Sequence, residues 1–172
     1  QEIPLALSLG SDIRISWDLT EKLKSASVFT VAKSRYFLLE LDDLTIPVGM
    51  GHLIAACRKE GFYPILTHPE RNRVFWSDPE LLQEIADMSV LIQVTAGSLT
   101  GIFGPKAKNT ALKLLEKGLV QVIASDAHGV DARLENFHEG LRIAAGIVGE
   151  ERLCDMVRNV PRMIVENMNF SP

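Results

Sequence analysis

Short apolar runs alternate with amphipathic segments along almost the whole chain, and this alternation restricts the fold more than any other feature. We expect strands at residues 3–9, 35–41, 63–68, 90–94 and 119–125, and helices at 18–25, 48–60, 77–88, 105–117 and from 134 onwards. Repeated strand-helix-strand units predict an α/β fold with a parallel sheet. Since no linker or low-complexity tract interrupts the pattern, we expect residues 1–172 to form one domain.

Two local signals refine this prediction. The segment 95–104 contains three glycines and follows an expected strand, so it is expected to be a loop. Pro161 is expected to break the C-terminal helical stretch, because proline removes a backbone donor from a helix interior.

Composition excludes several classes of protein. The chain is 47% hydrophobic and 23% charged, which is ordinary for a globular protein. Its net charge is −4 and it has no basic tract, so no nucleic-acid partner is expected. No apolar run approaches the roughly 18 residues that span a bilayer, so no membrane insertion is expected. Two cysteines without CxxC spacing favour the cytoplasm.

Polar residues with ligand chemistry recur where the expected strands end. Asp12, Glu40, His68, Thr95 and Asp126 each lie at or just past the carboxyl end of an expected strand. The carboxyl ends of parallel strands meet at one edge, and α/β proteins build their sites there. We therefore expect these side chains to converge.

Most of these residues are ambiguous when taken singly. Asp12, close after a glycine, is typical of a turn. The pair Asp126 and His128 is more often a capping carboxylate and a solvated imidazole, and His68 could be a hydrogen-bonded core residue. Glu40 is the exception, because a glutamate within an apolar run needs a partner such as a metal ion or an arginine.

Taken together, three carboxylates and two imidazoles suit Mn²⁺, Zn²⁺ or Fe better than Ca²⁺ or Mg²⁺. Two ions about 3.5–4 Å apart could hold a phosphate and supply hydroxide near neutral pH. Arg71 and Arg133 stand beside the candidate ligands, and arginine binds phosphate oxygens bidentately. Each arginine alone is more often a solvated surface residue, but their common placement favours a phosphate site.

Three segments, taken in order, carry a resemblance to a known family: THPERN at 67–72, TAGSLTGIFG at 95–104 and ASDAH at 124–128. The chain resembles the bacterial PHP-type protein tyrosine phosphatases, metal-dependent enzymes of capsule and exopolysaccharide gene clusters. The resemblance covers nearly the whole chain. It implies a distorted, TIM-like (β/α)7 barrel of the PHP superfamily with two or three metal ions, typically Mn²⁺, at the strand ends.

The resemblance also implies roles for individual residues. The positions that match metal ligands are Asp12, Glu40, His68, Asp126 and His128, with Glu40 bridging ions. The positions that match phosphate-binding arginines are Arg71 and Arg133. The implied substrate is a phosphotyrosine protein, in particular the tail of a bacterial tyrosine kinase.

The family begins with a strand that contains an HxH motif, and no HxH occurs in this sequence. The chain also opens with Gln1 rather than methionine. We therefore expect an incomplete barrel that corresponds to the last two-thirds of the family, with little activity in residues 1–172 alone. An exposed sheet edge could then pair with another copy and give a homo-oligomer. Two alternatives stay open: another PHP hydrolase, such as a histidinol-phosphate phosphatase, and a non-catalytic regulatory remnant.

Overall fold

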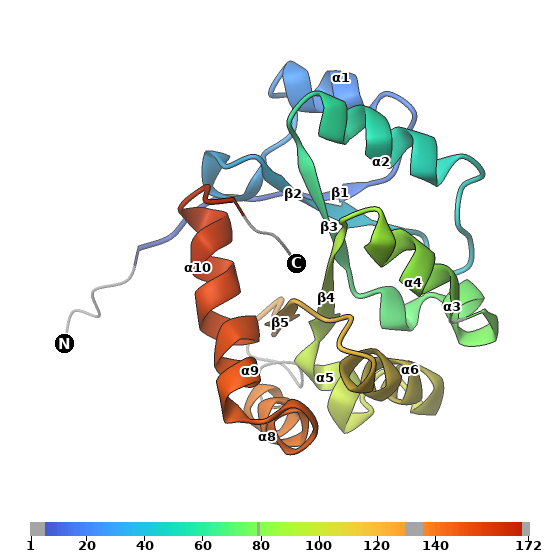
Figure 1. Cartoon of the computed structure of the whole chain (residues 1–172), viewed down its shortest axis with the longest axis vertical. Coiled ribbons are helices and arrows are strands. Elements are labelled where there is room, and N and C mark those ends of the chain that lie inside the picture. Colours follow the sequence, from blue (N-terminus) through green and yellow to red (C-terminus); the bar gives the residue numbers. More distant parts are fainter. Residues whose placement is uncertain (1–5, 79, 130–135, 170–172) are drawn as a thin grey trace.

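The described part of the computed structural model comprises residues 6–78, 80–129 and 136–169, and its centre is a parallel sheet (Figure 1). The strands are β1 (Asp12–Arg14), β2 (Tyr36–Glu40), β3 (Tyr63–Thr67), β4 (Leu91–Thr95) and β5 (Val122–Ala124). They lie in the order β1-β2-β3-β4-β5, and all four pairings are parallel. The prediction of an α/β fold with a parallel sheet is confirmed.

Helices connect the strands and cover the sheet. The α-helices are α1 (Leu19–Lys24), α2 (Met50–Lys59), α3 (Arg73–Ser77), α4 (Glu80–Asp87), α5 (Ala96–Thr100), α6 (Pro105–Glu116), α8 (Phe137–Val148), α9 (Glu150–Cys154) and α10 (Val160–Val165). The described residues also form two short 3-10 turns, η1 (Val31–Lys33) and η2 (Pro69–Arg71), and a π-helical segment, η3 (Asp155–Asn159). Within the described ranges, no helix is long and apolar enough to cross a membrane.

Alternate residues of β2, β3, β4 and β5 feed two hydrophobic clusters, because successive side chains of a strand point to opposite faces. The larger cluster takes Phe37 and Leu66 from the sheet and packs them against helices that include α2, α4 and α6. The smaller cluster takes Tyr36 and Ile65, and α10 covers it with Ile164. Figure 1 shows α1 and α2 beside β1 and β2, and α10 running up to η1, which precedes β2.

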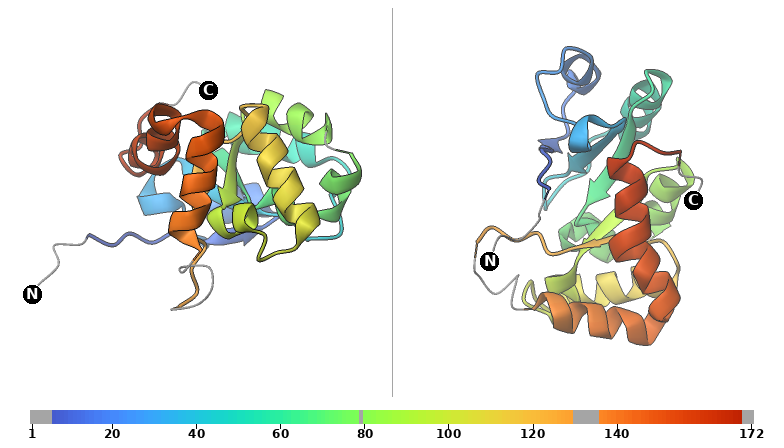
Figure 2. Two further views of the ribbon diagram at one scale, coloured as in Figure 1. Left: turned by 90° about the horizontal axis from the view of Figure 1, so that it is seen from below. Right: turned by 90° about the vertical axis from the view of Figure 1, so that its left-hand side faces the viewer.

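The expected strand at residues 3–9 is wrong where the structure describes it. Residues 6–10 form no strand, and Leu7 and Leu9 are 86% and 71% exposed. Figure 2 shows this stretch running out from the body of the molecule. An apolar run becomes a strand only when neighbouring strands and helices bury it, and among the described residues no strand pairs with this stretch. The first strand among the described residues is instead β1, which begins at Asp12.

The expected loop at 95–104 is also wrong in its first half, because Ala96–Thr100 forms the helix α5. The glycines in this segment serve close packing and helix termination. A Cβ at Gly97 would stand 2.5 Å from the Ile102 side chain, and Gly101 ends the helix at φ 98°. Such uses of glycine look the same in sequence as a flexible loop.

The expected break at Pro161 appears as a change of helix type rather than as an end of the helix. The helical stretch passes from α9 through the π-helical segment η3 into α10, and Pro161 lies in the first turn of α10. Proline has no N–H to donate, so it interrupts the hydrogen-bond ladder of this continuous helical stretch, and the π-helical segment η3 lies directly before the interruption.

Helix α8 lies against α5 so closely that its packing requires glycine. A Cβ at Gly140 would stand 2.3 Å from the carbonyl oxygen of Ala96, and backbone cannot move aside as a flexible side chain can. We expect Gly140→Ala to lower the free energy of unfolding by about 1–3 kcal/mol, the usual effect of overpacking. Urea unfolding measures it.

Gly146 provides a matched control on the same helix, since nothing lies within 4 Å of a Cβ built there. Gly146→Ala should raise the free energy of unfolding by about 0.5–1 kcal/mol, because alanine is the better helix former. Equal stability changes of one sign in both variants would contradict the close contact between α8 and α5.

Candidate functional site

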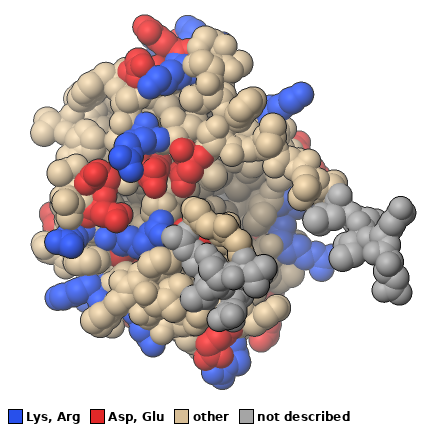
Figure 3. Space-filling model, turned by 180° about the vertical axis from the view of Figure 1, so that it is seen from behind, with Lys and Arg blue, Asp and Glu red and all other residues tan. Residues whose placement is uncertain are grey.

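A cavity of about 750 Å³ opens at the edge of the sheet where β2, β3 and β5 end. Its ionisable lining residues are Asp12, Glu40, Asp42, Asp43, Asp126, Arg14, Arg71, Arg73, His68 and His128. The remaining lining residues are Leu41, Leu44, Trp76 and Phe103. Figure 3 shows acidic and basic side chains gathered on this hollowed face. The cavity has the size of a small-molecule site and combines charge with aromatic surface.

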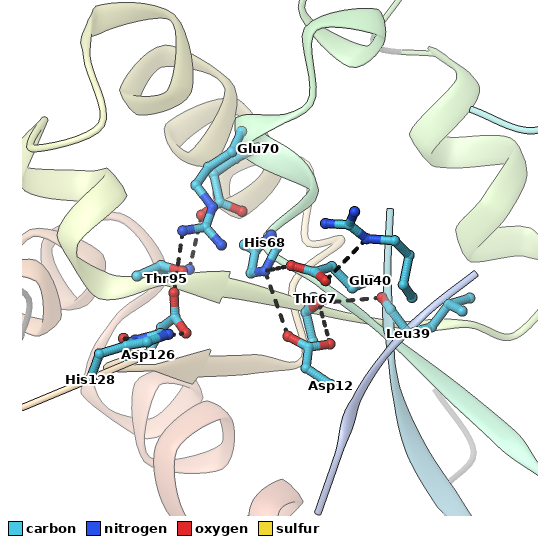
Figure 4. Close-up of polar contacts among 11 residues, drawn as sticks. Asp12, Leu39, Glu40, Thr67, His68, Glu70, Thr95, Asp126 and His128 are labelled. Atoms are coloured by element: carbon cyan, nitrogen blue, oxygen red, sulfur yellow. Dashed lines mark hydrogen bonds and ion pairs between the residues drawn. The ribbon is translucent and has the colours of Figure 1, made fainter. Parts of the chain in front are cut away.

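Asp12, Glu40 and His68 form a compact cluster within this cavity. Each offers one ligand atom, and these atoms all lie within 4.8 Å of one another. The imidazole Nε2 of His68 stands 3.6 Å from Asp12 Oδ2 and 3.6 Å from Glu40 Oε1. Figure 4 shows the three side chains pointing toward one another.

Three neighbouring strands bring the cluster together. Glu40 is the last residue of β2, and His68 directly follows β3, as expected. Asp12 differs from its prediction, because it opens β1 rather than following a strand. Its side chain still lies in the cluster. There the hydroxyl of Thr67, the last residue of β3, donates a hydrogen bond of 3.0 Å to Asp12 Oδ1.

The backbone at His68 is itself unusual. It adopts φ 36° and ψ 45°, a left-handed conformation that a non-glycine residue rarely takes. Its N–H donates to the carbonyl oxygen of Gln93 on β4, at 2.8 Å. Such strain persists only where the surroundings hold it, and it occurs frequently at functional sites.

The chemistry of this cluster fits a metal ion. Two carboxylates close together repel each other unless a cation or a proton intervenes. The separations of 3.6 Å to His68 are too long for hydrogen bonds, so these side chains do not satisfy one another. Arg14 Nε, 3.8 Å from Glu40 Oε2, compensates part of the charge from an exposed position. Two carboxylate oxygens and one imidazole nitrogen are suitable ligands for Mn²⁺, Zn²⁺ or Fe.

Arg71 projects into the same cavity and pairs with Asp126. Its Nη1 donates to Asp126 Oδ2 at 3.2 Å, and both side chains are largely buried. The guanidinium also stacks over the ring of Phe103, 4.9 Å from its centroid. Its Nε is buried and has no hydrogen-bond partner. The arginine is thus held on two sides while it lines the cavity, as an anion-binding residue requires.

The other expected site residues have different outcomes. Asp126 and His128 line the cavity but are outside the three-residue cluster. His128 is 67% exposed, and its Nδ1 lies 2.9 Å from the carbonyl oxygen of Asp126, to which it donates. Arg133 lies outside the described residues.

Sequence reasoning missed two polar residues that support the site. Thr67 orients Asp12, as described above. Glu70 is 0% exposed, and its Oε1 accepts hydrogen bonds from the Thr95 N–H at 3.0 Å and the Ser98 hydroxyl at 2.6 Å. Burial raises the pKa of the Glu70 carboxyl, and the two hydrogen bonds oppose that shift. The signal available in the sequence was a glutamate in the turn that follows a buried strand.

Comparison with known proteins identifies relatives over nearly the whole chain. Residues 1–166 match the sequence profile of the family described as capsular polysaccharide synthesis, CpsB/CapC. Tyrosine-protein phosphatase YwqE of Bacillus subtilis is 33% identical over 169 residues, which cover 97% of this chain and 63% of YwqE. A putative tyrosine-protein phosphatase, CapC of Staphylococcus aureus, is 35% identical over 133 residues, or 77% of this chain and 52% of CapC.

A solved structure agrees with this relationship. It is among the crystal structures of YwqE from Bacillus subtilis and CpsB from Streptococcus pneumoniae, described as unique metal-dependent tyrosine phosphatases. It superposes with a TM-score of 0.91 at 30% identity, covering 98% of this chain and 68% of that one. The chain therefore spans between about half and two-thirds of the length of these relatives. The resemblance carried by THPERN, TAGSLTGIFG and ASDAH is confirmed, and the chain belongs to the CpsB/CapC capsular polysaccharide synthesis family.

Proposed function

We propose that this chain carries the phosphate-hydrolysing site of a metal-dependent protein-tyrosine phosphatase. One observation carries the proposal: the cluster of Asp12, Glu40 and His68 shares a cavity with Arg71. Ligands for a cation and a buried donor for a phosphate are together the minimum that metal-assisted phosphoester hydrolysis requires. The names of the relatives support the same reaction and substrate class.

In this proposal Asp12, Glu40 and His68 hold the metal, and Asp126 and His128, which follow β5, contribute further ligands. When bound, a divalent ion supplies Lewis-acid polarisation of a phosphoryl oxygen and a water molecule acidified toward neutral pH. Thr67 keeps Asp12 in place through its hydrogen bond. The ion we propose is Mn²⁺, with two or three ions in the complete protein.

The arginines neutralise the phosphate in this proposal. Arg71 is fixed by Asp126 and Phe103, so it can present its guanidinium to the phosphoryl oxygens with little loss of freedom. Arg133 is the second phosphate-binding arginine, on the strength of the sequence resemblance. Phe103 and Trp76 line the cavity and offer apolar surface to a phenol ring. A phenolate leaving group, with a pKa of about 10, needs less protonation than an alkoxide.

We extend the proposal to the fold of the complete protein, its substrate, its location in the cell and its assembly. Residues 1–172 form one PHP-type domain, and the five-stranded sheet is part of a distorted (β/α)7 barrel. The substrate is a phosphotyrosine protein, with the tail of a bacterial tyrosine kinase as the specific candidate. The protein acts in the cytoplasm, which agrees with two cysteines that are both unpaired. Association of copies through the sheet edge at β1 would give a homo-oligomer.

The alternatives are tested by the choice of substrate. The named relatives favour phosphotyrosine over histidinol phosphate. Comparable turnover of L-histidinol phosphate and of a phosphotyrosine peptide would contradict the proposed specificity. Metal binding without turnover of either substrate, measured on the full reading frame, would support the regulatory alternative instead.

The metal prediction concerns His68, the buried member of the cluster. We expect His68→Ala to weaken Mn²⁺ binding by about 100-fold or more, because losing even an outer contact of a metal ligand costs 10–100-fold. Titration with Mn²⁺ after chelator treatment measures the affinity. His52→Ala is the matched control, since His52 is exposed on α2 and does not line the cavity. Equal Mn²⁺ affinity in both variants would remove His68 from the metal site.

The phosphate prediction concerns the two arginines. Arg71→Ala and Arg133→Ala, made in the full reading frame, should each lower kcat/KM for a phosphotyrosine peptide by about 100-fold or more while sparing Mn²⁺ content, because an arginine clamp acts on transition-state charge. Arg162→Ala is the control, as Arg162 is an exposed residue paired with Glu166 on the surface. Wild-type kinetics in the Arg71 variant, or a parallel loss of metal, would contradict the assigned role.

A further inference from the structure

Glu70 occupies an unusual place beside the site. It lies in η2 between Pro69 and Arg71, and two residues after His68. Its side chain turns away from the cavity, because Glu70 does not line it and is fully buried. Figure 4 shows Glu70 on the other side of His68 from Asp12 and Glu40. The chain thus alternates here between residues that face the cavity and one that enters the interior.

The buried carboxyl is fixed at one oxygen. Oε1 accepts hydrogen bonds from the main-chain N–H of Thr95 and from the hydroxyl of Ser98, at 3.0 and 2.6 Å. Oε2 is buried and has no hydrogen-bond partner. Burying a carboxyl with half of its hydrogen-bonding capacity unused costs free energy. A hydrophobic side chain would avoid that cost, so the contact to Thr95 and Ser98 needs a reason other than core stability.

The hydrogen-bond partners of Glu70 lie in a buried, closely packed part of the molecule. Thr95 is the last residue of β4, which lies between β3 and β5, and Ser98 belongs to α5. Gly140 of α8 packs directly on Ala96, the first residue of α5. Thr95 and Ser98 are both buried. The carboxyl of Glu70 therefore connects the turn to the buried junction of β4 and α5.

The turn that Glu70 ties down needs such support. His68 is in the left-handed region, and the Arg71 N–H donates to the His68 carbonyl oxygen at 3.1 Å, so the two residues belong to one compact turn. The indole of Trp76 donates to the Glu70 carbonyl oxygen at 2.8 Å and holds the same turn from outside. A rotation of this turn would move His68 and Arg71 together.

We propose that Glu70 is a positioning residue whose hydrogen bonds to Thr95 and Ser98 set the orientation of His68 and Arg71 simultaneously. The catalytic consequence rests on the proposed function, whereas the positioning itself does not. Glu70 does not line the cavity, so it acts through His68 and Arg71, which belong to the same turn.

Three variants test this role in the whole chain. Glu70→Ala removes the acceptor and should weaken Mn²⁺ binding by about 10-fold or more, as loss of an orienting contact does at metal sites. Glu70→Gln keeps the size and one carbonyl oxygen for the same two donors, so its Mn²⁺ affinity should stay within about threefold of wild type. Ser98→Ala removes one donor and should fall between them.

A second readout needs neither metal nor turnover. In the metal-free chain, the NMR resonances of the His68 imidazole and of the buried Arg71 Nε–H should both move in Glu70→Ala and return toward wild type in Glu70→Gln. If the wild type fails to bind Mn²⁺ or to hydrolyse phosphotyrosine, the proposed function fails, yet these resonances still report the positioning.

The control is a buried residue away from the turn. Ile54→Ala on α2 removes core packing in the larger cluster. Urea unfolding measures the free energy of unfolding of this variant and of Glu70→Ala, so that their losses of stability can be compared. Equal loss of Mn²⁺ affinity in Ile54→Ala would overturn the proposal, since general loosening would then explain the effect. Unmoved His68 and Arg71 resonances in Glu70→Ala, or a Glu70→Gln variant as impaired as Glu70→Ala, would overturn it as well.

Discussion

Parallel pairing of five strands in sequential order is the constraint on which the site depends. In a parallel sheet every carboxyl end lies at the same edge, so residues far apart in sequence meet without any long loop. The register makes this concrete: Arg14 lies opposite Glu40, and Thr67 lies opposite Gln93. His68 then follows β3 directly and meets Glu40 from the neighbouring strand. Strand order and register thus bring Glu40 and His68 together, and Asp12, which opens β1, joins them through its hydrogen bond from Thr67.

Electrostatics explains why this edge is specialised. Five carboxylates and three arginines line one cavity, and the cluster of Asp12, Glu40 and His68 has no complete set of hydrogen bonds within itself. A fold selected for stability alone would separate like charges or replace them with apolar residues. A cation at the cluster and an anion at Arg71 would each relieve part of this imbalance, which is the physical basis of the proposed chemistry.

The sequence predicted what periodicity and residue type encode. Four of the five expected strands appear in the structure, and Glu40 and His68 lie at strand ends because an apolar run stops there. Predictions failed where tertiary context decides. The segment 6–9 stays outside the sheet, and Gly97 signalled a loop although it serves packing within α5. Thr67 and Glu70 were missed because a buried hydroxyl or carboxyl gains its meaning from its partners on other strands and helices.

Asp126 has a predicted role and an observed contact that look incompatible but are not. It was expected to bind metal, yet its Oδ2 pairs with Arg71. A carboxylate has two oxygens with several acceptor sites, so an arginine on one oxygen does not prevent coordination through the other. Oδ1 indeed lies 3.9 Å from the Nδ1 of His128, the other expected ligand from this strand end. If Asp126 binds the metal as proposed, the same carboxylate joins the metal centre to the phosphate-binding arginine. Their relative position would then be fixed by one side chain, held by a backbone at φ 52° that is as constrained as that of His68.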